Sequence, residues 1–291
     1  MIHAKSGDTR FLDRIDAETF YGTVHSTFNR TLNIRCLNSG ELYTIACRDF
    51  DDGPNTIIAD FADLRHFHIR VNESIYGMAN QIRIGNQMIL FTKNSRRWTC
   101  TLPDFPKSTS LLKKNLPIAM RYINEFGQGG GIQPCQQSGN IFDKEITRML
   151  KERSDALLEA FIWGREQGVI LAARQLLGLG PGLTPSGDDF LVGLFAVMNL
   201  QGSPLSVFKS LYSQIIIHAQ QLTNEISFAA LHQATQGQVR ESMVQFIKAL
   251  LNGNTETFFP TLSTVLGIGS SSGTDIAMGI CSGLQLCCKN N

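Results

Sequence analysis

The chain has 291 residues, of which 43% are hydrophobic and 18% charged, and its formal net charge is +1. These proportions are typical of a folded globular protein and exclude an intrinsically disordered one. A charge so close to neutral gives no electrostatic reason to expect nucleic acid or an anionic membrane as a partner.

The start of the chain and its cysteines favour a cytoplasmic protein. The N-terminal segment contains no apolar run of the kind found in a signal peptide. No apolar stretch reaches the roughly 18 residues that a membrane helix needs. The seven cysteines form no C-x-x-C pair, so neither a disulfide framework nor a zinc site is indicated. We therefore expect reduced thiols, no membrane partner and a cytoplasmic location.

Residues 1–105 are predicted to form a small β-rich domain. Short apolar and β-branched runs, separated by turn residues, recur there at 31–36, 42–47, 56–59, 81–84 and 87–91. Gly85 and Asn86 stand between the last two runs as a two-residue turn, which is a strong signal for a hairpin. Several short strands with such turns predict an antiparallel sheet or barrel.

Residues 106–291 are predicted to form a larger, all-helical domain, so the expected fold class is α+β. Apolar residues recur there at helical spacing, and almost no strand pattern is present. We expect helices over 117–126, 142–163, 165–177, 188–200, 204–222, 227–236, 241–251 and 274–287. The first of these is predicted to begin at Pro117, because proline suits the first helical position.

The most informative segment runs from Gly178 to Gly193, between two predicted helices. Glycines allow a backbone to approach a ligand closely, and a helix beginning near Asp188 would direct free N–H groups into the loop. Such an arrangement favours a small anion. The candidate ligand-binding residues share this loop: Gly180, Gly182, Thr184, Ser186 and Gly187.

Common nucleotide-binding and hydrolase motifs do not explain this loop. Gly182 and Gly187 have the spacing of a phosphate-binding P-loop, but Asp188 and Asp189 follow where lysine and a hydroxyl residue belong. The alternative is architectural: Ser186 or Asp188 caps the helix, and the glycines only make a tight turn. Capping requires one side chain, so two adjacent acids favour a functional site.

A second segment repeats the design of the first. The pattern Ser-Gly-x-Asp-x-x-x-Gly begins at Ser186 and again at Ser272, and Leu-Gly-x-Gly precedes both copies. We therefore predict that both loops line one cleft at helix N-termini. The second loop adds the candidates Ser271, Ser272, Gly273 and Asp275. Thr223 and Ser227 share a helical face between the loops and could add hydroxyl groups; an ordinary helix cap is the alternative there.

The two loops resemble the family called domain of unknown function 2877, which includes the AllH subunit of oxamate carbamoyltransferase from allantoin degradation. The first loop, LGLGPGLTPSGDDFLVG, and the later SGTD element carry this resemblance. Members of that family have Gly-His-Thr-Ser-Gly in the second loop, whereas Ser270 stands here at the histidine position. Without this histidine, the resemblance does not imply a general base at this position, and a different substrate is the alternative.

The resemblance implies transfer of a carbamoyl group between oxamate and phosphate, in a hetero-oligomer with other subunits. Loop amides would then bind a carboxylate or phosphate, and the catalytic candidates are Asp188, Asp189 and Asp275. Asp188 or Asp189 would accept hydrogen bonds from a carbamoyl NH2. Alternatively, these two aspartates hold Mg²⁺ that bridges a phosphate, and no other cofactor is expected. The competing hypothesis is a non-catalytic, regulatory subunit that binds a small anion.

Overall fold

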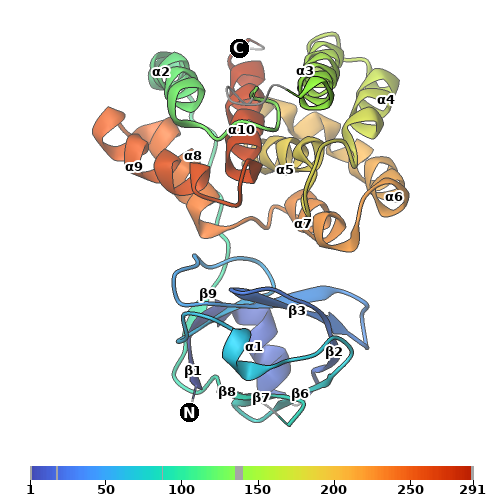
Figure 1. The fold of residues 1–291 in the computed structure, drawn as a ribbon. Helices are drawn as coiled ribbons and strands as arrows, with labels where there is room; N and C mark the ends of the chain where they lie inside the picture. Colours follow the sequence, from blue (N-terminus) through green and yellow to red (C-terminus); the bar gives the residue numbers. More distant parts are fainter. Residues whose placement is uncertain (1, 18, 87, 135–139, 290–291) are drawn as a thin grey trace. The chain divides into compact units, whose positions relative to one another are not determined.

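The protein forms two compact units, residues 1–100 and residues 101–291 (Figure 1). Its structure is a computed structural model that describes residues 2–17, 19–86, 88–134 and 140–289. The first unit is built mainly from strands and the second from helices, so the predicted α+β fold class is confirmed. Within the described residues, no helix is long and apolar enough to cross a membrane.

The strands of the first unit form a single sheet that closes on itself. In the described part of the chain they are β1 (Ile2–Asp8), β2 (Tyr21–Thr27), β3 (Thr31–Cys36), β4 (Leu42–Ala46), β5 (Thr56–Ala59), β6 (Ser74–Met78), β7 (Gln81–Ile84), β8 (Met88–Phe91) and β9 (Arg96–Trp98). Their order is β5-β4-β3-β2-β6-β7-β8-β1-β9, and β5 also pairs with β1, as in a barrel. Most pairs are antiparallel, whereas β1–β8, β1–β9 and β4–β5 are parallel.

Both strand pairs expected from the sequence are present. β3 pairs with β4 and β7 pairs with β8, both antiparallel, and Gly85 has a positive φ of 49° in the turn between β7 and β8. The sequence analysis missed β1, β2, β6 and β9, together with a short helix, α1 (Thr9–Asp16), and a 3-10 turn, η1 (Arg65–Phe67). β1 was missed because its buried end consists of Ser6, Gly7 and Asp8 and has no apolar alternation.

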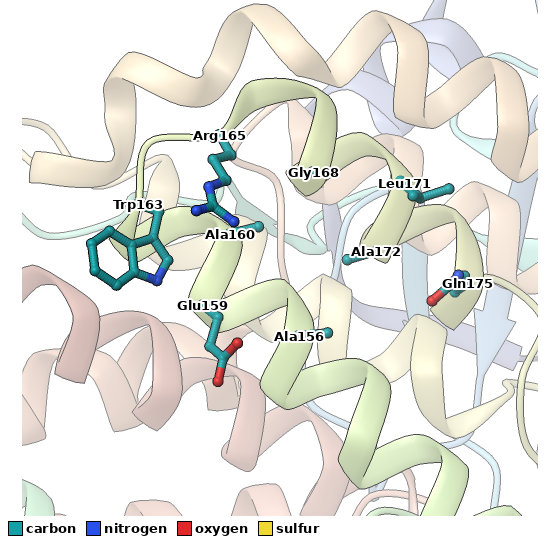
Figure 2. Close-up of a pocket in the computed structure, with 9 residues that line it drawn as sticks. All are labelled: Ala156, Glu159, Ala160, Trp163, Arg165, Gly168, Leu171, Ala172 and Gln175. Carbon is teal, nitrogen blue, oxygen red and sulfur yellow. The ribbon is translucent and has the colours of Figure 1, made fainter.

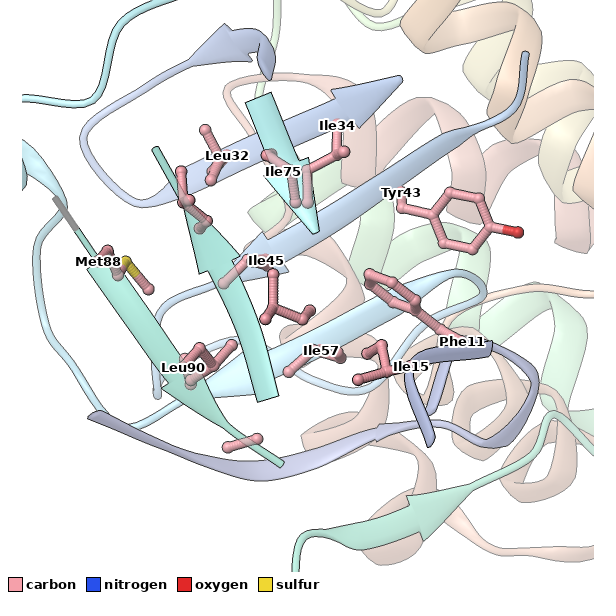
Figure 3. Packing of buried hydrophobic residues seen from close by; sticks show 14 of the residues in the cluster. Phe11, Ile15, Leu32, Ile34, Tyr43, Ile45, Ile57, Ile75, Met88 and Leu90 are labelled. Carbon is pink, nitrogen blue, oxygen red and sulfur yellow. The ribbon is translucent and has the colours of Figure 1, made fainter. Parts of the chain in front are cut away.

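Side chains fill the interior of the barrel. Phe11 and Ile15 of α1 are fully buried there and pack among aliphatic residues of the strands (Figure 3). The carboxylate of Asp8 holds the start of α1 in place. It accepts hydrogen bonds from the N–H of Arg10 at 3.0 Å and from the N–H of Asn55 at 2.7 Å. This unit therefore has a packed core of its own.

The second unit is helical throughout its described part. Its helices are α2 (Ser110–Phe126), α3 (Ile141–Ile162), α4 (Glu166–Leu176), α5 (Ser186–Met198), η2 (Pro204–Leu211), α6 (Tyr212–Leu222), α7 (Glu225–Thr235), α8 (Glu241–Asn252), α9 (Thr255–Leu266) and α10 (Ser272–Lys289). Every residue of α5 is buried, and α5 packs directly against α10 (Figure 1). These two helices form the centre of the unit.

Three details of the predicted helices were wrong. The first helix begins at Ser110 rather than Pro117, because burial of Leu112 and Leu116 extends it upstream and Pro117 is accommodated inside it. The predicted helix 204–222 is divided into η2 and α6. Helix α9 was missed, and Pro260 lies within it.

Six cysteines lie in the described part of the chain. Five of them are buried and Cys288 is half-buried, as expected for reduced thiols. Cys135 lies outside the described residues.

Candidate functional site

The first glycine loop joins α4 to α5 and approaches its neighbours so closely that side chains are excluded. Gly178, Gly180 and Gly182 all have positive φ, at 71°, 117° and 97°. A Cβ on Gly178 would lie 2.1 Å from the carbonyl oxygen of Leu222. Glycine is therefore required at this position both by conformation and by space.

The second loop, between α9 and α10, repeats the backbone of the first. The N–H of Gly187 donates to the carbonyl of Leu179 at 2.9 Å, and the N–H of Gly273 donates to the carbonyl of Ile268 at the same distance. The hydroxyl groups of Thr184 and Ser272 lie 2.8 Å apart and join the two loops. Both loops thus meet at helix N-termini, as predicted, and a ligand-binding cleft between them stays a prediction.

Asp188 fixes the first loop to the turn between α6 and α7. Its Oδ1 accepts the N–H of Gly178 at 2.9 Å, and its Oδ2 accepts the hydroxyls of Ser227, at 2.7 Å, and Thr223. Burial raises the pKa of Asp188, and these three donors oppose the shift. Thr223 and Ser227 were predicted to contact a ligand, but in this structure their hydroxyls bind Asp188.

Capping does not explain the acidic pair. The N-cap residue of α5 is Pro185, which has no side-chain cap, and the helix begins at Ser186, two residues before the predicted start. The alternative in which Ser186 or Asp188 simply caps this helix is therefore wrong.

A third glycine segment, Gly127–Gly131, covers the second loop. The N–H of Gln128 donates to the Thr274 hydroxyl at 2.8 Å, and the N–H of Ile132 donates to Oδ1 of Asp275 at 2.8 Å. A Cβ on Gly131 would lie 2.2 Å from Oδ2 of Asp275. The sequence analysis missed these contacts, although four glycines in five residues exceed what the end of a helix requires.

Asp189 and Asp275 occupy equivalent positions in the two repeats, and both are almost completely buried. Oδ2 of Asp189, Oδ2 of Asp275 and Oγ of Ser186 have no hydrogen-bond partner within the described chain. Such atoms are rare in proteins because an unpaired buried polar group is destabilising. Three of them at the junction of two loops indicate a site for a ligand.

Burial also raises the pKa of both carboxyls, to about 8 for Asp189 and about 7 for Asp275. The hydroxyls of Ser272 and Thr184 oppose the shift at Asp189, whereas the charges of Asp275 and Asp188 increase it. The Ser186 hydroxyl lies near enough to lower the pKa of Asp275, although its oxygen makes no hydrogen bond there. Perturbed acids of this kind are typical of functional sites.

A metal site in these loops stays a prediction. Within the described residues, no group of three or more His, Cys, Asp or Glu side chains could hold a metal ion. Both oxygens of Asp188 already accept hydrogen bonds from the chain. Only Asp189 and Asp275 each keep an unpartnered oxygen for a cation.

A groove between α3 and α4 is lined by residues that belong to neither loop (Figure 2). Alanines, Gly168 and Leu171 contribute much of its lining, and Trp163 stands at one end with the guanidinium of Arg165 5.7 Å from its ring centre. The polar side chains Glu159 and Arg165 are exposed to solvent. The groove lacks the buried, unpartnered groups that distinguish the loops.

The protein has an α+β fold in which two similar glycine loops meet at the N-termini of α5 and α10. Two sequence models of one family match this chain: the AllH family N-terminal domain over residues 3–97, and oxamate carbamoyltransferase subunit AllH over residues 176–284. Together they cover most of the sequence and both repeats, and the chain belongs to the AllH family. No solved structure matches it significantly.

Proposed function

We propose that this chain is a subunit of a carbamoyltransferase that acts on oxamate and carbamoyl phosphate, and that the paired loops bind its substrate. The family match supports the reaction class. The proposed place of substrate binding is supported by one observation: Ser186, Asp189 and Asp275 have unpartnered atoms that are buried where the two loops meet. The same proposal assigns the reaction to nitrogen recovery from allantoin in the cytoplasm.

In this reaction the bond between the carbamoyl carbon and a phosphate oxygen breaks while a bond from that carbon to the oxamate nitrogen forms. The nitrogen loses one proton and phosphate leaves; the reverse direction returns the carbamoyl group to phosphate. Neither loop contains lysine, arginine or histidine. Stabilisation of an anion therefore depends on backbone N–H groups at the helix N-termini.

Suitable N–H groups are present on the loops. Gly182, Leu183 and Ser270 are exposed, and their N–H groups donate to no partner within the described residues. These groups are placed to bind the carboxylate of oxamate or the phosphate of carbamoyl phosphate. Ser270 stands at the position of the histidine in the resembling sequences, so catalysis here would not use an imidazole base from this loop.

The second candidate is a non-catalytic subunit that binds a small anion and regulates the complex. The absence of histidine and cysteine from both loop segments favours it, since neither offers a strong base or a thiol nucleophile. Both candidates require partner subunits of the same transferase.

Reconstitution distinguishes the two candidates. Carbamoyl transfer is measured with this chain alone, with the other subunits alone, and with all of them together. We expect transfer only in the complete mixture, with Asp189→Asn reducing it and the exposed control Asp155→Asn leaving it unchanged. Full activity of the other subunits without this chain would contradict a catalytic role and favour the regulatory one.

A further inference from the structure

The unpartnered carboxyl oxygens at the loop junction lack a hydrogen-bond donor when the carboxyls are ionised. An ionised carboxylate oxygen only accepts hydrogen bonds, and the chain supplies none to Oδ2 of Asp189 or of Asp275 within its described part. The two carboxyls come from different helices, and each lies near hydroxyl groups of both loops: Ser272 and Thr184 near Asp189, and Ser186 and Ser271 near Asp275.

The position of these oxygens is fixed from several sides. The hydrogen bond between Thr184 and Ser272 holds the loops together, and the backbone at Gly131 leaves no room for Asp275 to move away. The Ile132 N–H fixes the other oxygen of Asp275. The unpartnered oxygens are thus preorganised, as a recognition site requires.

We infer that Oδ2 of Asp189 and Oδ2 of Asp275 together form a subsite for the NH2 of a primary amide. This inference rests on the proposed function, since it orients a substrate already placed at the loops. An NH2 group carries two N–H donors and can bond one oxygen of each carboxyl. A carboxylate or phosphate in the same place would meet two acids and no basic side chain.

The exposed N–H groups of Gly182, Leu183 and Ser270 complete the arrangement. They are donors, so they suit the anionic end of a ligand, while the buried carboxyl oxygens suit its amide end. Oxamate and carbamoyl phosphate both join a –CONH2 group to an anion. The arrangement therefore fits one such molecule at a time, with its amide at the buried oxygens and its anion at the exposed N–H groups.

Paired ligands test this orientation directly. Oxalate has the shape of oxamate but carries a carboxylate oxygen in place of the NH2. Calorimetry on the full chain should show oxamate binding tighter than oxalate by about tenfold or more, since one lost hydrogen-bonded group at a polar site has at least this effect. In Asp189→Asn and Asp275→Asn the preference should fall to near one, while the control Asp155→Asn should keep it.

Proton linkage supplies a second measurement that does not depend on a variant. N–H donors favour the ionised carboxyl, so oxamate binding should release protons, and calorimetry in two buffers of different ionisation enthalpy measures their number and sign. Proton uptake would mean that an anion faces the carboxyls, and this would overturn the subsite.

Other outcomes also contradict the inference. Equal binding of oxalate, equal binding of ammonium ion, or a strict requirement for Mg²⁺ would each overturn an amide subsite. Unchanged transfer by the reconstituted complex carrying both Asn variants would remove the subsite but keep the proposed function. Loss of both oxamate binding and transfer by the wild-type complex would overturn the two together.

Discussion

Gly193 of α5 and Gly279 of α10 are equivalent residues of the two repeats, and each makes the same contact with the opposite helix. A Cβ on Gly193 would lie 2.2 Å from the carbonyl oxygen of Ile276, and one on Gly279 would lie 2.1 Å from that of Phe190. Ile276 and Phe190 are themselves equivalent. The repeat is thus an approximate two-fold relationship in which the helix backbones touch.

This contact predicts that neither glycine tolerates alanine. Gly193→Ala and Gly279→Ala should each lower the free energy of unfolding by about 3 kcal/mol or more, because a methyl group would force two backbones apart. Gly267→Ala is the control: its Cβ would meet nothing closer than 3.4 Å, and its φ of −76° suits alanine. Denaturant unfolding measures all three, and similar losses in the control would contradict the explanation.

Asp188 and Asp189 are adjacent but should respond differently to the same substitution. In Asp188→Asn one donor from Gly178, Thr223 or Ser227 would face an NH2 group, which should cost about 2–3 kcal/mol of stability. Asp189→Asn removes an unpartnered buried acid whose raised pKa lowers stability at neutral pH, so stability should not fall while ligand binding is lost. Melting temperature and calorimetry test the pair. If binding survives in Asp189→Asn, this residue is not part of the site.

Stability should fall as pH rises across neutrality. The folded pKa is about 8 for Asp189 and about 7 for Asp275, whereas an unfolded aspartate titrates near about 3.9. Between these values the folded state keeps a proton that the unfolded state has lost. Each group therefore reduces the free energy of unfolding as pH increases, by up to about 1.4 kcal/mol per pH unit, and its effect ends above its folded pKa.

Unfolding by denaturant from pH 5 to pH 9 measures this slope. Asp189→Asn and Asp275→Asn should each flatten the profile, while Asp155→Asn should follow the wild type. Variant profiles parallel to the wild type would show that titration of these carboxyls does not cause the pH dependence of the free energy of unfolding.

Gly131→Ala should impair the site although Gly131 belongs to neither loop. Its Cβ would lie 2.2 Å from Oδ2 of Asp275, so the carboxyl must move from its present place. We expect at least about tenfold weaker oxamate binding, equivalent to about 1.4 kcal/mol. The exposed Asp155→Asn again serves as the control, and unchanged affinity in Gly131→Ala would argue against a role for the third glycine segment.

A structural feature could be predicted from the sequence when its pattern lies within a short segment of the chain. The hairpin at Gly85 and the paired loops could be predicted because their patterns lie within a few residues. β1 could not, since it pairs with strands distant in the chain and buries small polar residues. The position of β1 is determined by its pairing with β5, β8 and β9 in the closed barrel.

The roles of the aspartates in the two loops could not be predicted either, because their hydrogen-bond partners lie far away in the sequence. Asp188 binds Thr223 and Ser227, which are 35 and 39 residues away, and Asp275 binds the N–H of Ile132, which is 143 residues away. No local pattern distinguishes an acid that anchors the fold from one left unpartnered. The loops could therefore be identified from the sequence, but not which aspartates keep an unpartnered oxygen.

Hydrogen exchange with and without oxamate tests most directly whether both loops bind one ligand. Segments 177–185 and 267–271 should become protected together when oxamate is added to the full chain. The groove segment 156–175 should exchange at an unchanged rate. Protection confined to the groove between α3 and α4, or to one loop alone, would contradict a shared substrate site at the loop junction.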